Sequence, residues 1–531
     1  MENEKRFIIA IGLCVLVILA WQSYMRKYAK PYQMPQQTTE VVSEVPLAVV
    51  RTTPVEVEEQ RVGIKEKTAE IATDLFGVTL TTSGAAIKEM LLFDFKDNVG
   101  GNIVLSASNQ TSPHILQTLD SLTAKPEPWT LSSSSDSSAT FIKSGKYTTQ
   151  TKNFNFHKSS YIIELEHKII NNTSLPQTVS YQLVSGAALI GDGRLDKMYA
   201  GADAQVGEKV IRKKPGARGL KQGEQITGSP AWVSARSRYF SIVLKPNQQE
   251  KGASITSPSA KDIWSAIDVG PISIEPNDTV VRSYTMYAGP NNLEALASIG
   301  PGTNNVISYG IFGGIAKILF KGLQFFYKIS GNYGIAIIGL TLVISLVLSP
   351  LTRKSMHSMK ETQKVQPEVE RIKKEHSGDP QKMNKEIMEL YKTHHINPVG
   401  GCLPMLLQIP VFFALYQLFL RSVELKGAHF LWIKDLSEPD MAFTISQKLP
   451  IIGNSINILP ILAGLAMFAQ QKISHPGGEV SEQQRMMAIV MPVVFTFIFY
   501  SMPSGWILYF VTNTALTLIL QEFILKSRKP A

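Results

Sequence analysis

Two different patterns of apolar residues divide the chain. Between about residues 70 and 290, apolar and polar residues alternate in many short segments, as in YIIELEHKI (161–169) and VSYQLV (179–184). From residue 306 onward the apolar residues instead form long runs. Alternation is typical of strands with one buried face, and long apolar runs are typical of membrane spans. The pattern predicts a β-rich part followed by a helical membrane part.

The alternating part predicts a large antiparallel β-sandwich over residues 61–300. In YIIELEHKI, Ile163, Leu165, His167 and Ile169 fall on one face, opposite Glu164, Glu166 and Lys168. Clusters of Gly, Asn, Pro and Ser separate the strands, and the serine-rich segment 132–138 predicts a loop. Large sandwiches can bind glycans, but no pair of carboxylates stands out here. We therefore expect a scaffold or docking domain rather than a sugar-processing enzyme.

The N-terminal residues predict an uncleaved signal anchor over residues 1–27. Lys5 and Arg6 precede the apolar run FIIAIGLCVLVILAW (7–21), and no small-x-small cleavage site follows it. Residues 28–60 are rich in Pro, Gln, Thr, Val and Glu and show no stable period, which predicts a flexible linker. Only two cysteines occur in the chain, so a framework of disulfides is excluded.

The second half of the chain contains five further apolar runs that predict membrane spans. They are 334–351, 399–420, 456–469, 486–500 and 506–525. Together with the N-terminal anchor they make six spans. The predicted fold class is therefore a polytopic α-helical membrane protein with a large periplasmic antiparallel β-sandwich domain.

Another apolar run, at 306–329, has a polar stripe. Four polar residues recur at helical spacing and share one face: Lys317, Lys321, Gln324 and Lys328. Aromatic residues lie on the opposite face. We expect an amphipathic helix that lies in the membrane interface, within residues 305–330.

Basic residues between the apolar runs predict the orientation of the chain. Segment 353–397 carries ten Lys and Arg and the tail 526–531 carries three, whereas in loop 421–455 four acids balance four basic residues. Because Lys and Arg concentrate in cytoplasmic loops, we expect both termini in the cytoplasm and the β-sandwich in the periplasm of a Gram-negative cell, around a multi-pass inner-membrane part. This placement explains the net charge of +10 better than nucleic-acid binding does.

The basic segment 353–397 is organised as two amphipathic stretches around a Ser-Gly-Asp-Pro turn, which predicts a cytoplasmic helical hairpin. Pro367 should kink or interrupt its first arm. Its methionines either close the seam between the arms or offer a flexible surface to apolar clients. His394 and His395 could suggest a metal, but adjacent residues point apart on a helix and no acidic or Cys partner is near, so we expect no metal site.

Motifs over about residues 335–525 resemble those of the YidC membrane protein insertases. They occur in order, each at the boundary or kink of a predicted span: PLTRKS (350–355), NPVGGCLPMLLQIPVFFALY (397–416), FLWIKDLSEPD (430–440) and MPVVFTFIFYSMPSGWILYFVTN (491–513). The resemblance implies a five-span insertase core within residues 331–531. With the N-terminal anchor and the β domain, it implies the Gram-negative form, whose periplasmic domain is a β-supersandwich and not an enzyme.

The resemblance also implies a function and partners. It implies an insertase and chaperone for integral inner-membrane proteins, working alone or with the Sec translocon (SecYEG and SecDF). Its clients would be nascent membrane proteins; membrane lipids and a ribosome, reached through the hairpin and the basic tail, would be further partners. It implies no cofactor, no metal and no nucleic-acid substrate, and no GxxxxGK[ST] nucleotide-binding motif occurs in the chain.

Polar and helix-kinking residues inside the predicted spans suggest a groove for clients. A span that served only as an anchor would avoid them, whereas polar groups on short, kinked spans can hold water part-way into the membrane. The candidate groove residues are Thr341, Ser345, Pro404, Gln408, Pro410, Thr496, Tyr509, Phe510 and Thr512, and Asn513 is a further polar residue of the last span. The family usually carries a basic residue where Ser345 stands, so a groove cation is not expected here.

Two alternatives stay open from the sequence. The polar residues could simply join helices by hydrogen bonds. The chain could also be a polytopic transporter or channel, although its spans contain no internal acidic or basic residues to mark an ion path, and no inverted repeat is visible.

Overall fold

The structure is a computed structural model. It describes residues 66–97, 100–106, 112–120, 126–191, 193–376, 378–396, 403–449, 453–474 and 482–526. The N-terminal anchor and the linker predicted for residues 1–60 lie outside the described residues.

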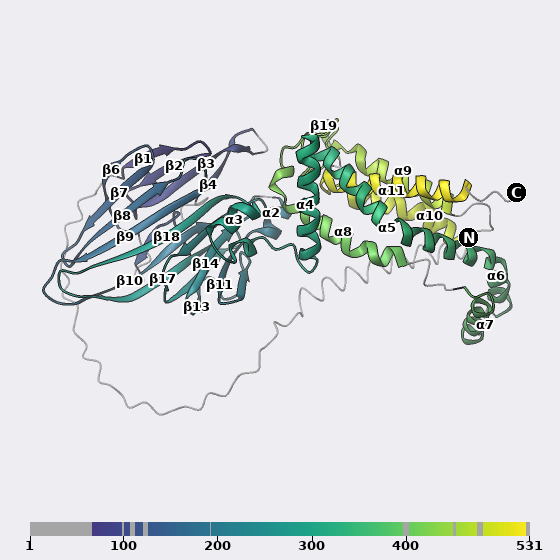
Figure 1. Cartoon of the computed structure of the whole chain (residues 1–531), viewed down its shortest axis with the longest axis horizontal. Helices are drawn as coiled ribbons and strands as arrows, with labels where there is room; N and C mark the ends of the chain where they lie inside the picture. The colour runs from purple at the N-terminus through teal and green to yellow at the C-terminus, as the bar shows by residue number, and fades with distance from the viewer. Residues whose placement is uncertain are drawn as a thin grey trace, which may run out of the picture. The chain divides into compact units, whose positions relative to one another are not determined.

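The largest sheet in the described part of the chain has nine antiparallel strands (Figure 1). Their order is β12 (Lys209–Lys213), β11 (Gly201–Val206), β14 (Pro230–Arg236), β15 (Phe240–Pro246), β18 (Thr279–Pro290), β9 (Ile162–Asn171), β8 (Thr148–Phe156), β7 (Ser138–Ser144) and β6 (Thr130–Ser134). The predicted loop at 132–138 is wrong for residues 132–134, which belong to the edge strand β6 paired with β7, and for Ser138, the first residue of β7. Serine suits this edge because most of the β6 side chains are exposed.

Two smaller antiparallel sheets accompany the large one in the described residues. One has the order β13 (Glu224–Thr227), β16 (Gly252–Ser259), β17 (Asp262–Ile274), β10 (Gln177–Ala187) and β5 (Thr118–Asp120). The other has the order β1 (Thr68–Ala72), β2 (Phe76–Thr81), β3 (Ala86–Lys96) and β4 (Asn102–Ser106). The predicted antiparallel β-rich part is confirmed.

All three sheets contribute to one hydrophobic core. In β9 the side chains alternate as the sequence predicts, and Ile163, Leu165 and His167 are buried on the core face. His167 is satisfied inside the protein, since its Nδ1 lies 2.9 Å from the hydroxyl of Tyr181. The four-stranded sheet joins this core through Phe76, whose ring centroid is 6.5 Å from that of Phe156 on β8.

Helices dominate the described chain after β18. They are α3 (Leu293–Ile299), α4 (Gly313–Ser330), α5 (Tyr333–Lys364), α6 (Gln366–Glu375), α7 (Pro380–Thr393), α8 (Leu403–Arg421), α9 (Ile458–Ser474), α10 (Glu482–Phe499) and α11 (Ser504–Lys526). Shorter elements are α2 (Arg194–Tyr199), η1 (Thr303–Val306), η3 (Val423–Leu425) and the hairpin of β19 (Phe443–Leu449) and β20 (Gly453–Ile456). The predicted helical C-terminal part is confirmed.

Helix α5 packs against α4, α8 and α11, and α9 packs against α11 (Figure 1). Aromatic rings fill the space between them: the ring of Trp506 lies 4.8 Å from that of Phe412 and 5.0 Å from that of Phe499. Helix α4 begins at Gly313 rather than at 305. It buries Ala316, Phe320 and Leu323 and leaves its lysines exposed.

One helix in the described residues is long and apolar enough to cross a membrane, over Tyr333–Met359. The apolar helices Ile458–Ile473 and Ala488–Phe499 are shorter. The six spans predicted from the sequence stay a prediction.

The first part of the basic segment 353–397 continues α5 to Lys364, and most of the rest forms a pair of helices, α6 and α7. Helix α5 ends at Lys364, and Pro367 lies in the first turn of α6, where a proline removes no helical hydrogen bond. The predicted interruption at Pro367 is therefore confirmed. His376 at the end of α6 pairs with Glu386 of α7 at 2.9 Å.

Candidate functional site: a polar cavity between three helices

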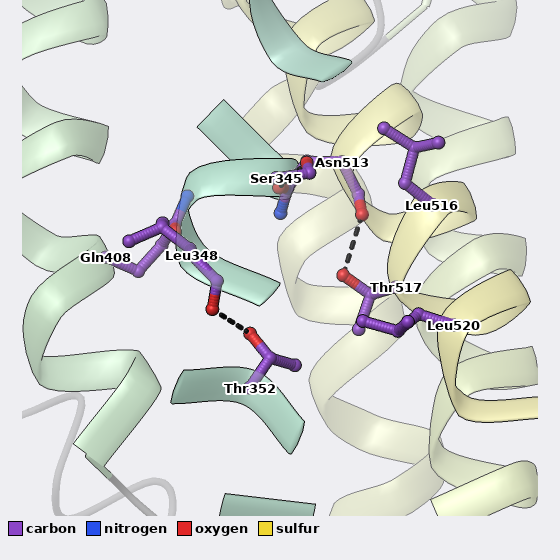
Figure 2. Close-up of a pocket in the computed structure, with 8 residues that line it drawn as sticks. All are labelled: Ser345, Leu348, Thr352, Gln408, Asn513, Leu516, Thr517 and Leu520. Atoms are coloured by element: carbon purple, nitrogen blue, oxygen red, sulfur yellow. Dashed lines mark hydrogen bonds between the residues drawn. The ribbon is translucent and has the colours of Figure 1, made fainter. Parts of the chain in front are cut away.

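A cavity of about 180 Å³ lies between α5, α8 and α11 (Figure 2). Its lining combines hydroxyl, amide and aliphatic side chains: Ser345, Leu348, Thr352, Gln408, Asn513, Leu516, Thr517 and Leu520. Helix periodicity explains why these residues meet. Those from α5 are spaced by three and four positions, as are those from α11, so each set forms one stripe on its helix.

Ser345 connects two walls of the cavity. Its hydroxyl donates a hydrogen bond to Oδ1 of Asn513 on α11, with a distance of 3.3 Å between the oxygens. Both side chains are half-buried. The contact therefore places one hydroxyl and one amide at the same level of the helix pair.

Gln408 forms the third wall, from α8. Its amide nitrogen donates to the hydroxyl of Tyr509 on α11. Tyr509 is 2% exposed, so this amide is the partner that satisfies its hydroxyl inside the protein. Tyr509 therefore supports the cavity from behind Gln408 and is not part of its lining.

The hydroxyls of Thr352 and Thr517 face the same cavity but are bonded to their own helices. Thr352 donates to the carbonyl of Leu348 at 3.0 Å, and Thr517 donates to that of Asn513 at 2.8 Å (Figure 2). A threonine hydroxyl bonded in this way keeps an acceptor lone pair for water or for a ligand.

Every residue that lines the cavity is uncharged. At the position where the family resemblance implies a basic residue, the chain presents the hydroxyl of Ser345. The cavity can therefore offer hydrogen bonds to water or to a peptide, but not a fixed charge.

Some of the predicted groove residues lie elsewhere. Thr341 is fully buried one turn before Ser345, and its hydroxyl donates to the carbonyl of Ile337 at 2.6 Å. Thr496 on α10 donates to the carbonyl of Pro492 and packs where Gly464 of α9 has no Cβ, which is a helix-packing role.

The remaining predicted residues do not line the cavity either. Pro410 lies half-buried within α8, and Phe510 and Thr512 lie half-buried on α11. The ring of Phe510 packs 4.9 Å from that of Phe499. The side chain of Pro404 is outside the described residues.

The set of candidate residues missed Thr352 and Thr517, whereas Asn513, noted as a polar residue of the last span, lines the cavity. Thr352 and Thr517 follow Ser345 and Asn513 by seven and four positions, so they could have been found by continuing each helical stripe toward the C-terminal end of its helix.

In the described residues no group of three or more His, Cys, Asp or Glu side chains could hold a metal ion. The cavity, with its neutral hydroxyls and amides, has a donor set that suits water and peptide groups better than a transition metal.

Two family models together match most of the chain. The model of the 60Kd inner membrane protein matches residues 325–531, and that of the YidC periplasmic domain matches residues 68–322. A membrane protein insertase YidC from Geotalea daltonii is 33% identical over an alignment of 552 positions, which covers 99% of this chain and 99% of that one. The chain belongs to the YidC family of membrane protein insertases. The resemblance found in the motifs is confirmed.

Other YidC proteins are similar over most of their length. The one from Geobacter sulfurreducens is 32% identical over 479 residues, covering 86% of this chain and 85% of that one. The crystal structure of YidC from Thermotoga maritima is 14% identical and matches with a TM-score of 0.31, covering 86% of this chain and 97% of that one. The alternative of a transporter or channel is not favoured by these YidC relatives. As in other YidC proteins, the β-rich part is the periplasmic domain of an inner-membrane protein.

Proposed function

We propose that this chain inserts integral proteins into the inner membrane and helps them fold, alone or with the Sec translocon. The groove for its clients is the cavity between α5, α8 and α11. The observation that supports this is the meeting of Ser345, Gln408 and Asn513, polar side chains from the apolar stretches of three helices, at one cavity.

The position of the cavity along α5 supports this function. At 1.5 Å per residue, Ser345 lies about 18 Å and Thr352 about 28 Å beyond the start of the helix at Tyr333. A hydrocarbon core is about 30 Å thick. If α5 begins at the periplasmic boundary, the cavity occupies the cytoplasmic half of the membrane, where a client enters.

Hydration explains how such a groove acts. A polar client segment loses its water on entering the hydrocarbon core, and this desolvation is the main barrier to its crossing. Hydroxyls and amides that hold water halfway through the membrane shorten the dry part of the path. The step forms and breaks no covalent bond, so it needs no catalytic residue and no nucleotide.

The proposed topology has six spans: the N-terminal anchor, α5, α8, α9, α10 and α11. Both termini and the α6–α7 hairpin then lie in the cytoplasm. The amphipathic helix α4 lies in the periplasmic interface, with its exposed lysines Lys317, Lys321 and Lys328 toward the headgroups.

The α6–α7 hairpin is the proposed contact for a ribosome, together with the basic tail. Its helices bury only one large side chain, Val369, and leave most of their lysines exposed. Exposed basic side chains on a short hairpin suit an RNA-rich partner. Nascent membrane proteins, lipids and the Sec translocon are the other proposed partners.

Site-specific photo-crosslinking tests the groove. A photoreactive residue at position 513 should capture a stalled membrane-protein client, whereas one at Ile519, which is 64% exposed on the same helix, should capture mainly lipid. Equal capture of the client from both positions would exclude the cavity as the client path. Failure of small membrane proteins to insert after depletion of this chain tests the function itself.

A further inference from the structure

A two-residue turn between α8 and α9 presents two large apolar side chains to solvent. Phe430 and Ile433 exchange backbone hydrogen bonds of 3.0 and 2.9 Å, which leaves Leu431 and Trp432 at the tip. Leu431 is 75% exposed and Trp432 is 39% exposed. Leu431 also has a φ of +52°, a conformation that favours Gly or Asn. A leucine at this position indicates that its side chain has a use besides forming the turn.

One side of the turn is fixed to the start of α5. The side chain of Asn332 accepts hydrogen bonds from the first-turn backbone N–H groups of Gly334 and Ile335, and so caps that helix. The same side chain donates to the carbonyl of His429 at 3.1 Å. The ring of Phe430 lies where a Cβ of Gly334 would otherwise be, so the turn rests directly on the α5 backbone.

The other side of the turn is fixed to the start of α9. Asp440 is 2% exposed, and its Oδ2 accepts a hydrogen bond of 2.7 Å from the backbone N–H of Leu459 in the first turn of that helix. The same oxygen accepts from Nε1 of Trp432 at 3.3 Å. The tip is thereby held level with the first turns of two helices.

We propose that the Leu431–Trp432 turn is a lipid anchor, which inserts into the periplasmic leaflet of the membrane and fixes the depth of α5 and α9. This rests on the proposed topology, in which both helices begin at that boundary. Trp has an apolar ring and one polar N–H, and it concentrates at this level of membrane proteins.

The charge beside the tip suits a phospholipid surface. Lys434 is exposed there, whereas Asp435 is half-buried and Asp440 is buried. Basic side chains beside an inserted apolar tip attract anionic headgroups. The turn therefore combines an apolar wedge with one exposed lysine, which suits the surface of an anionic bilayer.

Depth-dependent fluorescence quenching tests the anchor in the full-length protein. Leu431→Cys, made in a background with Cys14→Ser and Cys402→Ser that still inserts a client, is labelled with an environment-sensitive dye and reconstituted in vesicles of phosphatidylethanolamine and phosphatidylglycerol. Leu175→Cys is the matched control, because Leu175 is 67% exposed in the β-rich part. Lipids with a quencher on the acyl chain should quench the dye at 431 several-fold more than the dye at 175.

Three results would overturn the anchor. Equal lipid quenching at both positions would do so, as would strong quenching at 431 by aqueous iodide. Protection from both quenchers would indicate a protein partner instead.

If the labelled variant fails to fold, Trp432→Phe gives a second measurement. This substitution should remove a large part of the quenching of tryptophan fluorescence by brominated lipids. Unchanged quenching would contradict the proposal. Neither measurement uses client insertion. The lipid-anchor proposal can therefore be contradicted while the proposed client groove is still supported.

Discussion

The hydroxyl of Ser345 on α5 donates to the side-chain oxygen of Asn513 on α11, at 3.3 Å. The pair lies at the cavity between α5, α8 and α11, whose lining is polar and uncharged. A neutral pair can exchange its hydrogen bond for water or for a client peptide at little electrostatic cost.

The contact between Gln408 and Tyr509 should stabilise the three-helix arrangement. Gln408→Leu leaves the buried Tyr509 hydroxyl without its partner, and an unpaired buried polar group costs about 1 to 3 kcal/mol. Adding Tyr509→Phe removes the unpaired group and should restore part of the stability. Thermal unfolding in detergent of the two single variants and the double variant measures this coupling. Additive losses in the double variant would show that the two side chains do not depend on each other.

A positive charge should be tolerated in the cavity. Ser345→Arg places a guanidinium among hydroxyls and amides that can solvate it, so the protein should fold and should translocate acidic client tails better than basic ones. Wild type, whose cavity lining is neutral, should show a smaller difference between acidic and basic tails. The measurement is protease accessibility of matched client tails that differ only in charge. Loss of folding in Ser345→Arg would show that the position is packed and dry.

The residue patterns predicted the architecture well because each depends on local periodicity. The alternation in β9 and the apolar run of α5 are properties of neighbouring residues, so they can be read without knowing the rest of the chain. The family motifs added the identity. The edge strand β6 was missed because a run of serines is also typical of loops, and only its pairing with β7 makes it a strand.

The candidate site was predicted less completely. Ser345 and Gln408 line the cavity as expected, but Thr341 and Thr496 turn their hydroxyls to their own backbones. Polarity in a span shows that a residue is unusual there, but not whether it faces a cavity, a neighbouring helix or its own carbonyls. That distinction depends on the rotation of each helix, which tertiary packing decides.

Arg238 should hold the β-rich part to the segment that follows α8. It is 4% exposed, and its guanidinium donates to the carbonyls of Leu420 and Ser437 and to the carboxylate of Glu438, at 2.9 to 3.1 Å. Arg238→Ala leaves these acceptors unpaired, and breaking a buried pair costs about 3 to 5 kcal/mol.

Limited proteolysis and thermal unfolding in detergent check this. Arg238→Lys should recover only part of the loss, because a lysine cannot match the planar fork of an arginine. Arg218→Ala removes an exposed arginine of the same part and serves as the control. If Arg238→Ala and Arg218→Ala unfold at the same temperature and are cleaved at the same rate, the contacts of Arg238 contribute nothing to stability.

Glu424 should make the stability of this region depend on pH. Burial raises its pKa from 4.5 to about 7. Because the folded-state pKa lies above the unfolded one, the stabilisation by this group is fully present below about pH 4.5 and is lost as the pH rises to about 7. Glu424→Gln stays neutral throughout, so it should match wild type near pH 5 and be more stable near pH 8.

Thermal unfolding of both proteins across this range measures the difference. Glu208→Gln, at an exposed position, is the control for the substitution itself. A difference for Glu424→Gln that stays constant with pH would show that the pKa of Glu424 is the same in the folded and unfolded protein.

Translocation of an acidic client tail by a variant with an apolar cavity tests the central claim most directly. The triple variant removes one polar side chain from each wall of the cavity, through Ser345→Ala, Gln408→Leu and Asn513→Leu. The control is Thr341→Val, because Thr341 is buried and does not line the cavity. Cells depleted of the wild-type copy and making each variant at normal level are assayed by protease accessibility of the tail. The triple variant should translocate acidic tails several-fold less than wild type and neutral tails nearly as well, because charged groups have the largest desolvation cost. If the triple variant translocates acidic tails as well as wild type does, the polar cavity is not the path of the client.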